Sequence, residues 1–204
     1  MELHARFLRS ILAGDLAGAL AIAREARAHS LPFFYEEIVA RSLAEVGRRW
    51  EIGEISIADE HVATAVAQSV IASFYPSFPW APEGPKGVVA CPSGERHELG
   101  ARIAADLLAN DGWNVLFVGA DVPEDALLAL VARERPRLVG LSIALPERLP
   151  RLRETIAQLR KLAPAPKLLV GGRAVSSIAS ADLGVDAVAI SAADVVALTQ
   201  GWKS

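Results

Sequence analysis

Cysteine is almost absent from the sequence, which has a single copy, Cys91, among its 204 residues. One cysteine excludes a disulfide within the chain, and chains without disulfides are typical of the reducing cytoplasm. Cys91 ends the apolar run GVVAC, where a cysteine usually serves as a small buried hydrophobic side chain. We therefore predict a cytoplasmic protein in which Cys91 packs in the core.

A long apolar run and a surplus of positive charge are also missing. No stretch reaches the roughly 18 apolar residues that a membrane span needs, and the N-terminus MELHARFLRS is too polar for a signal peptide. The formal net charge is −3, and arginines alternate with acidic residues, as in PERLPRLRE. A nucleic-acid-binding domain usually carries a clustered basic face. We expect no membrane association and no direct binding to nucleic acid.

The first part of the chain has a helical pattern. Hydrophobic residues make up 52% of the sequence, enough for a sizeable core, and up to residue 76 they recur at three- and four-residue spacing. This periodicity predicts four helices, the third a long one over residues 33–54. Asp15 is suited to begin a helix, Ser30 to help end one, and Ser56 to cap the last. Short turns indicate an antiparallel bundle over residues 1–76.

The remainder of the chain alternates between strands and helices. Four prolines in PSFPWAPEGPKG indicate a linker, residues 77–86. From residue 87 to 204, short apolar runs alternate with amphipathic stretches, which predicts a parallel sheet covered on both faces. The fold class is therefore α/β: a four-helix bundle followed by a Rossmann-like, flavodoxin-like doubly wound sheet of five parallel strands.

The first loop of this sheet lacks the glycines of a dinucleotide site. Ligands of such sheets bind beyond the carboxyl ends of the strands, where a dinucleotide fold carries G-x-G-x-x-G. Here the loop reads PSGERHELG, with Gly94 and Gly100 too far apart and charged residues between them. A pyrophosphate needs bare backbone amides at this place. The loop therefore disfavours nicotinamide and flavin cofactors.

The same loop contains a histidine between carboxylates. Glu95 lies two residues before His97, so its carboxylate is placed to accept the proton of one ring nitrogen. The other nitrogen would then be a fixed acceptor, as in metal-ligating histidines. One histidine does not hold a free metal ion, but it can hold a metal that arrives with its other ligands, as in haem and corrin cofactors.

Two further loops are suited to a ligand at the same edge of the sheet. GLSIAL places Ser142 near the end of the third strand, and VGGRA places Gly171 and Gly172 after the fourth. Paired glycines at a strand end let a ligand approach the backbone closely. Each signal is also compatible with an ordinary loop.

Together these residues resemble a known family. GERHELG fits the E-x-H-x-x-G form of the cobalamin-binding signature, followed by the serine of LSIAL and the GG pair. The resemblance covers essentially the whole chain. It implies that His97 replaces the cofactor's own base as lower cobalt ligand, with Glu95 as its partner, and that the nucleotide tail enters a slot lined by the serine and glycine loops. The residues it implies at the site are Glu95, Arg96, His97, Leu99, Gly100, Ser142, Ala144, Gly171 and Gly172.

The bundle carries a second motif, in RRWEIGEISIADEHVAT. Trp50 is followed after nine residues by Glu60 and His61, so a short connection brings the three toward one place. Standing alone, the motif would also fit a core tryptophan and a solvated first turn. In a bundle before a cobalamin domain it is similar to the CarH-type photoreceptors, which use adenosylcobalamin. The resemblance implies that Trp50, Ile57, Glu60 and His61 surround the upper ligand.

The sequence departs from those photoreceptors in two ways. They carry a DNA-binding segment before the bundle, whereas this chain begins at the bundle, so we expect either a trimmed piece or a sensor that acts through a protein partner, such as a transcription regulator. They also carry histidine after the tryptophan, where this chain has Glu51. A carboxylate is a weaker partner for cobalt than imidazole, which leaves His61 as the candidate upper ligand after illumination.

These features predict a binding and sensing protein rather than an enzyme. Loss of the adenosyl group would leave apolar residues of the bundle without a partner, a change able to bias a two-state switch. A corrinoid methyl carrier, with methylcobalamin, is the alternative, although it needs no tryptophan-containing lid. Cobalamin storage or delivery is another. A mutase would need a barrel for which no chain remains. The sequence leaves open whether the chain forms a homo-oligomer.

Overall fold

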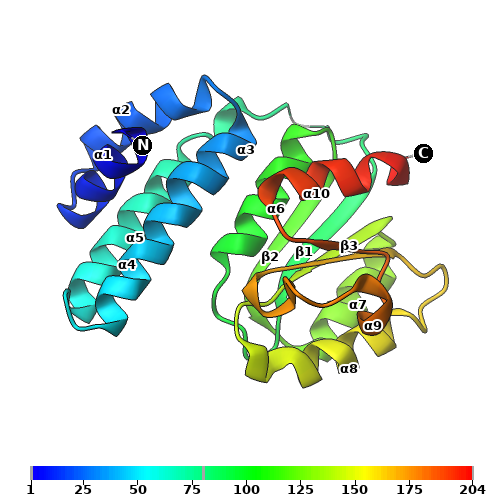
Figure 1. The fold of residues 1–204 in the computed structure, drawn as a ribbon. Coiled ribbons are helices and arrows are strands. Elements are labelled where there is room, and N and C mark those ends of the chain that lie inside the picture. The colour runs from blue at the N-terminus through cyan, green and yellow to red at the C-terminus, as the bar shows by residue number, and fades with distance from the viewer. Residues whose placement is uncertain (1, 80, 204) are drawn as a thin grey trace. The chain divides into compact units, whose positions relative to one another are not determined.

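The computed structural model describes residues 2–79 and 81–203 and divides the chain into two compact units, residues 1–77 and 78–204. The first unit is entirely helical and the second contains a single sheet (Figure 1). None of the helices in the described part is long and apolar enough to cross a membrane.

The helical unit packs its helices side by side around an aromatic core (Figure 1). Phe7, Ile11, Phe34 and Tyr35 are fully buried, and the Phe34 ring meets Phe74 edge-on at 5.3 Å between centroids. Its helical segments are α1 (Glu2–Leu12), α2 (Leu16–Arg27), α3 (Leu31–Phe33), the π-helix η1 (Phe34–Ala40), α4 (Arg41–Glu51), α5 (Ile57–Ala72) and the 3-10 turn η2 (Tyr75–Ser77).

The helix starts follow the capping residues of the sequence. Asp15 accepts a hydrogen bond from the Gly18 N–H at 2.9 Å and begins α2. Ser56 and Asp59 form the reciprocal capping box of α5, with the Ser56 N–H donating to the Asp59 carboxylate at 2.8 Å. The interpretation of Ser30 was wrong: it does not end α2 but begins α3, because its hydroxyl accepts from the Phe33 N–H.

The third predicted helix is continuous but not uniform. Residues 31–51 form α3, the π-helix η1 and α4 in succession, so the long helix starts before residue 33 and ends before residue 54. A π-turn inserts an extra residue into the hydrogen-bond pattern and rotates the residues that follow it. Hydrophobic spacing does not reveal this local change, because the buried residues keep an approximately helical period.

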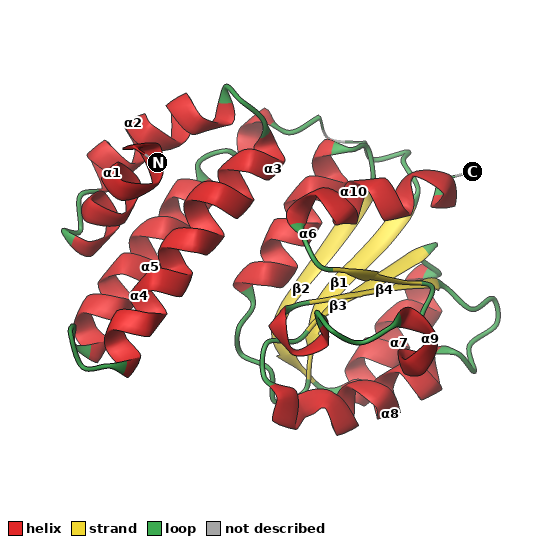
Figure 2. Ribbon diagram, in the orientation of Figure 1, coloured by secondary structure: helices red, strands yellow, loops and turns green. Residues whose placement is uncertain are grey.

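The second unit is built on five parallel strands in the order β2-β1-β3-β4-β5 (Figure 2). This is the flavodoxin-like doubly wound order, so the predicted fold class is confirmed. The strand order reverses between β1 and β3, which makes the carboxyl edge beyond these strands the expected ligand site. The strands are β1 (Lys86–Pro92), β2 (Asn114–Val122), β3 (Leu138–Ser142), β4 (Lys167–Gly171) and β5 (Ala187–Ala189).

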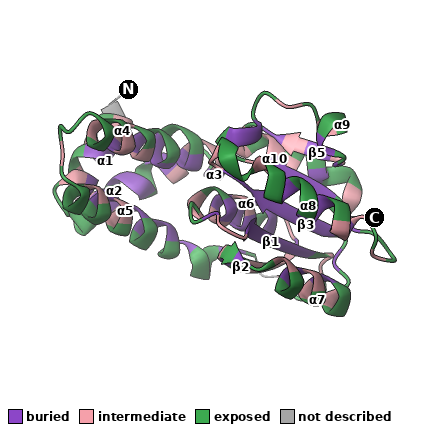
Figure 3. Ribbon diagram, turned by 90° about the horizontal axis from the view of Figure 1, so that it is seen from below, coloured by how far each residue is buried: buried purple, intermediate pink, exposed green. Residues whose placement is uncertain are grey.

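Helices cover both faces of this sheet, and β1 and β3 between them are buried, whereas the edge strand β2 is partly exposed (Figure 3). On one face α7, α8 and α9 pack on the alternate residues of β1, β3 and β4, such as Val88, Val139 and Val170. On the other face α6 packs against β1, β2 and α10. The helices are α6 (Leu99–Asn110), α7 (Glu124–Glu134), α8 (Leu149–Leu159), α9 (Ser180–Leu183) and α10 (Ala192–Thr199).

Gly171, the last residue of β4, and Gly172, which follows it, differ in their surroundings, and this difference gives a test of the fold at the ligand edge. Gly172 has φ of 105°, and a Cβ there would clash with the Ile143 carbonyl oxygen and lie 2.9 Å from the Ile143 nitrogen. At Gly171 the nearest atom to a Cβ would be the Ala189 oxygen at 3.4 Å, an ordinary contact.

We expect Gly172→Ala to lower the free energy of unfolding by about 2 kcal/mol or more, since it adds backbone strain and a clash with a buried strand end. The matched variant Gly171→Ala should change it by less than about 1 kcal/mol. Chemical denaturation of both variants checks this. Equal decreases in unfolding free energy for the two variants would contradict the difference in their surroundings.

Candidate functional site

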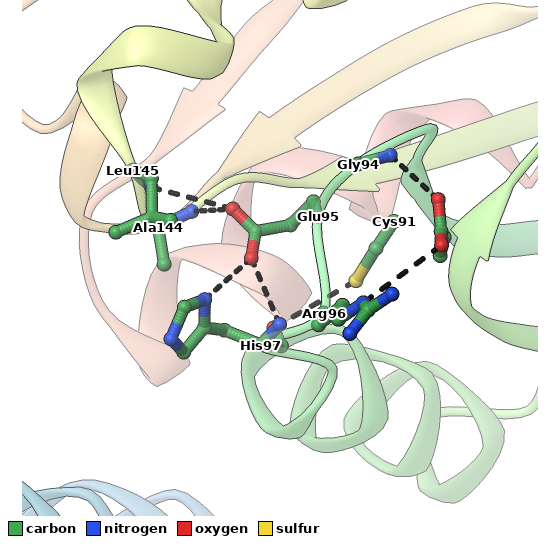
Figure 4. Close-up of polar contacts among 8 residues, drawn as sticks. Cys91, Gly94, Glu95, Arg96, His97, Ala144 and Leu145 are labelled. Atoms are coloured by element: carbon green, nitrogen blue, oxygen red, sulfur yellow. Dashed lines mark hydrogen bonds and ion pairs between the residues drawn. The ribbon is translucent and has the colours of Figure 1, made fainter.

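The loop between β1 and α6 lies at the carboxyl edge of the sheet and carries the predicted histidine (Figure 4). The His97 side chain is 58% exposed, whereas the Glu95 carboxylate beside it is fully buried. The His97 Nδ1 lies 2.6 Å from a Glu95 oxygen, and the His97 backbone N–H donates to the same oxygen at 2.8 Å. The ring is therefore fixed at Nδ1 and presents Nε2 as the nitrogen able to bind a ligand.

The second oxygen of Glu95 binds a different part of the fold. It accepts hydrogen bonds from the backbone N–H groups of Ala144 at 2.8 Å and Leu145 at 3.3 Å, in the loop after β3 (Figure 4). The carboxylate thus joins the histidine loop to the neighbouring strand end. Leu145 was not recognised from the sequence, because it acts through its backbone N–H and not through its side chain.

These contacts also hold Glu95 in its ionised form. Burial opposes ionisation of this carboxyl group, but the hydrogen bonds from the His97 and Ala144 backbone and from the His97 ring outweigh it and lower the Glu95 pKa below its ordinary value. A carboxylate that remains charged holds the hydrogen on Nδ1 and leaves Nε2 as the nitrogen that faces a ligand.

Ser142 and the glycines of the signature come together on the α6 side of the sheet. A Cβ on Gly100 would lie 3.1 Å from the Ser142 hydroxyl oxygen, so glycine lets the first turn of α6 approach this hydroxyl closely. Ser142 pairs with Gly171 across β3 and β4, and the Ile143 N–H donates to the Gly171 oxygen at 3.0 Å. The residues predicted to line the tail slot are therefore neighbours.

The other residues named around the histidine differ in exposure. The Arg96 side chain is 84% exposed and its guanidinium lies 3.9 Å from the Asp121 carboxylate. Leu99 is the first residue of α6. Cys91 is buried, as predicted, and burial, followed by the charges of Glu95 and Glu98, raises the pKa of its thiol to about 12. Asp121, on β2, was not recognised from the sequence.

The residues of the second motif share one end of the helical unit. Trp50 is in the last turn of α4, and Ile57, Glu60 and His61 begin α5. Trp50 and Ile57 are 46% and 49% exposed, as are several other large apolar side chains of this chain. Glu60 accepts from the Thr64 hydroxyl at 2.8 Å and lies 2.5 Å from the His61 Nδ1.

The described residues contain no group of three or more His, Cys, Asp or Glu side chains able to hold a metal ion. His97 is thus suited to a metal that brings its remaining ligands with it, as a corrin does. The ionised Glu95, the Nε2 left to bind a ligand and the close approach of Gly100 to the Ser142 hydroxyl fit such a group.

Comparison with known families agrees with this chemistry. One model of a B12 binding domain matches residues 85–199, and a second B12 binding domain model matches residues 3–74. The chain belongs to the B12-binding-domain family.

The chain is similar to two kinds of characterised relative. It is 36% identical to the HTH-type transcriptional repressor CarA of Myxococcus xanthus over 64% of this chain and 43% of the relative, and 33% identical to CarH of the same organism over 70% and 48%. It therefore spans about half the length of these repressors. It is 26% identical to the dimethylamine corrinoid protein of Methanosarcina barkeri over 87% of this chain and 86% of that protein.

The fold has solved counterparts. The Methanosarcina barkeri monomethylamine corrinoid protein matches with a TM-score of 0.79 over 98% of both chains at 21% identity, a level that supports the fold alone. A cobalamin-binding protein of Desulfitobacterium hafniense matches with a TM-score of 0.55 at 25% identity.

The buried carboxylate gives a test that needs no cofactor. Glu95→Gln keeps the shape but turns an amide NH2 toward backbone donors, so we expect the free energy of unfolding at pH 7 to fall by about 1–3 kcal/mol. Because the Glu95 pKa is lowered from 4.5, its contribution is complete above that value and is lost as the pH falls through the folded pKa. The difference in unfolding free energy between Glu95→Gln and wild type should therefore become smaller at acidic pH.

Denaturation curves at neutral and acidic pH measure this difference. The exposed Glu83, changed to Gln, is the matched control and should leave stability within about 0.5 kcal/mol at both pH values. If the difference in unfolding free energy between wild type and Glu95→Gln does not change with pH, the negative charge of Glu95 does not contribute to stability.

Proposed function

We propose that this protein binds cobalamin with the cofactor's own base displaced and His97 as the lower cobalt ligand. The observation that carries the proposal is the exposed imidazole held at Nδ1 by a buried, ionised carboxylate. Glu95 fixes the ring at Nδ1 and leaves Nε2 to bind cobalt. We assign Arg96, next to the histidine in the loop, and Leu99, the first residue of α6, to the same site. The family membership and the corrinoid relatives support the same cofactor.

We further propose that the displaced nucleotide tail lies along Gly100, Ser142, Ala144, Gly171 and Gly172. Gly100 lets the start of α6 approach the Ser142 hydroxyl closely, and Gly172 has a backbone conformation that side chains rarely adopt. A hydroxyl, strand-end amides and bare backbone are suited to phosphate and sugar oxygens.

The helical unit would contribute the upper side of the site. Trp50 and Ile57 expose apolar surface that a large upper ligand would cover, and Glu60 has a carboxylate placed to accept a hydrogen bond. Adenosylcobalamin supplies a light-absorbing centre with a weak bond to its upper group. We propose that the protein is a sensor of this cofactor that reports the loss of the upper group to a protein partner, such as a transcription regulator in the cytoplasm. The similarity to CarA and CarH supports this reading.

A corrinoid methyl carrier is the second candidate. The dimethylamine corrinoid protein of Methanosarcina barkeri matches over 86% of its own length, whereas the two repressors match over less than half of theirs. A carrier would hold methylcobalamin through the same His97 and would open its upper side to partner enzymes.

The first experiment tests cofactor binding. The purified chain, loaded with methylcobalamin in darkness and freed of excess, should retain cofactor with a spectrum of the base-off, histidine-on type. His97→Ala should abolish that spectrum and weaken retention by at least tenfold, since the histidine–cobalt bond is lost. His29→Ala, in the helical unit, is the matched control and should behave as wild type. Retention unchanged by His97→Ala would overturn the assignment of His97.

A second experiment separates sensor from carrier. With adenosylcobalamin bound, green light should give a spectral change that persists in darkness. Because the exposed Glu51 is a poor cobalt ligand, His61 should bind in place of the lost group, so His61→Ala should alter the illuminated spectrum and leave the dark spectrum unchanged. Illumination that yields no more than free cobalamin shows would reject the sensor and favour the carrier.

A further inference from the structure

Strand β2 departs from regular pairing where it approaches the histidine loop. Its register with β1 runs from Val89 opposite Phe117 to Ala90 opposite Gly119 and Pro92 opposite Val122, with an irregularity at each step. Bulges of this kind bend a strand and redirect its side chains, often beside functional sites. The second irregularity contains Asp121, which has a φ of 51°, a conformation that residues other than glycine seldom adopt.

Asp121 makes two hydrogen bonds to the loop that carries His97. Its carboxylate accepts from the Gly94 N–H at 2.6 Å, and its own N–H donates to the Glu95 carbonyl oxygen at 2.8 Å. The Gly94 nitrogen is drawn with this contact in Figure 4. Asp121, with its unusual backbone conformation, is thus hydrogen-bonded to both Gly94 and Glu95, the residues shortly before the histidine.

Other contacts restrict the same loop from its far side. Gly94 has φ of 84°, and a Cβ there would lie 3.0 Å from an Arg148 guanidinium nitrogen, so the loop passes between Asp121 and Arg148. The Glu95 side chain is held by the Ala144 and Leu145 amides. Glu95 is therefore fixed through its backbone from β2 and through its carboxylate from the loop after β3.

The ion pair with Arg96 does not account for the role of Asp121. The closest approach is 3.9 Å, and the two side chains are 84% and 45% exposed, so solvent screens the pair and it contributes little. The acceptor oxygen toward Gly94, rather than the negative charge, is the feature that matters. An asparagine at this position would keep an acceptor and tolerates positive φ.

We propose that Asp121 is a positioning residue for His97: by fixing Gly94 and the Glu95 backbone from β2, it sets the place of the Glu95 carboxylate and, through it, the orientation of the imidazole toward cobalt. The inference rests on the proposed binding of cobalamin through His97. The orientation of His97 would then depend on contacts from β2 and from the end of β3, and not on the histidine loop alone.

The test uses methylcobinamide, a corrinoid without a nucleotide tail, so that affinity reports the histidine–cobalt bond and not the tail slot. Asp121→Ala should weaken binding by about tenfold at pH 7 and lower the histidine-on fraction of the bound spectrum, as loss of one strong hydrogen bond would. Asp121→Asn should stay within about threefold of wild type, because it keeps the acceptor. Asp182→Ala, at an exposed aspartate of α9, is the control for removal of a carboxylate.

A third variant separates positioning from backbone strain. Asp121→Gly relieves the positive φ but removes the acceptor, so it should bind methylcobinamide as weakly as Asp121→Ala does. Binding by Asp121→Gly at the wild-type level would show that the carboxylate has no positioning role and would overturn the inference.

Hydrogen exchange of backbone amides in the cofactor-free chain tests the role of Asp121 even if a variant retains no corrinoid. The His97 N–H, which donates to Glu95, should exchange faster in the alanine and glycine variants and at the wild-type rate in Asp121→Asn. Equal exchange in all of them would reject positioning. Failure of the proposed function would give a different result. The wild-type chain would then lack the histidine-on spectrum, or His97→Ala would leave that spectrum unchanged.

Discussion

The site depends on one buried carboxylate. Glu95 is fully buried and its two oxygens accept from His97 on one side and from the amides after β3 on the other. A charge in the interior is costly unless hydrogen bonds satisfy it. Here the same bonds that satisfy the charge also orient the imidazole and join two strand ends. Removing any of them would leave a buried group without a partner, so the arrangement of the loop and the ionisation of Glu95 support each other.

The parallel sheet explains why these groups meet. In the order β2-β1-β3-β4-β5, the ends of β1 and β3 lie next to each other at the reversal of strand order. The histidine loop leaves β1, the amides that bind Glu95 follow β3, and the irregular end of β2 approaches from the other side. The helical unit adds a different chemistry, with exposed Trp50 and Ile57 beside a Glu60–His61 pair at one end.

Much of the fold was accessible from residue order. The periodicities of 3.6 and 2 are local properties, so the helical first part, the five strands and the parallel class followed from the sequence. Caps at Asp15 and Ser56 depend on contacts three residues away and were also predictable. The π-helix over Phe34–Ala40 was not, because it changes the hydrogen-bond register without changing which residues are apolar. Ser30 was misread because the same residue type serves at either end of a helix.

The candidate site divides in the same way. By itself the sequence determined the Glu95–His97 spacing, the missing dinucleotide glycines and the presence of Ser142 and a glycine pair after later strands, because these are short-range patterns. Only the tertiary structure decided that the second oxygen of Glu95 binds amides 49 and 50 residues further on, and that Asp121 reaches back to Gly94 over 27 residues. Those bonds depend on strand order, on a bulge and on backbone N–H groups that every residue type except proline carries, so no pattern of residue types predicts them.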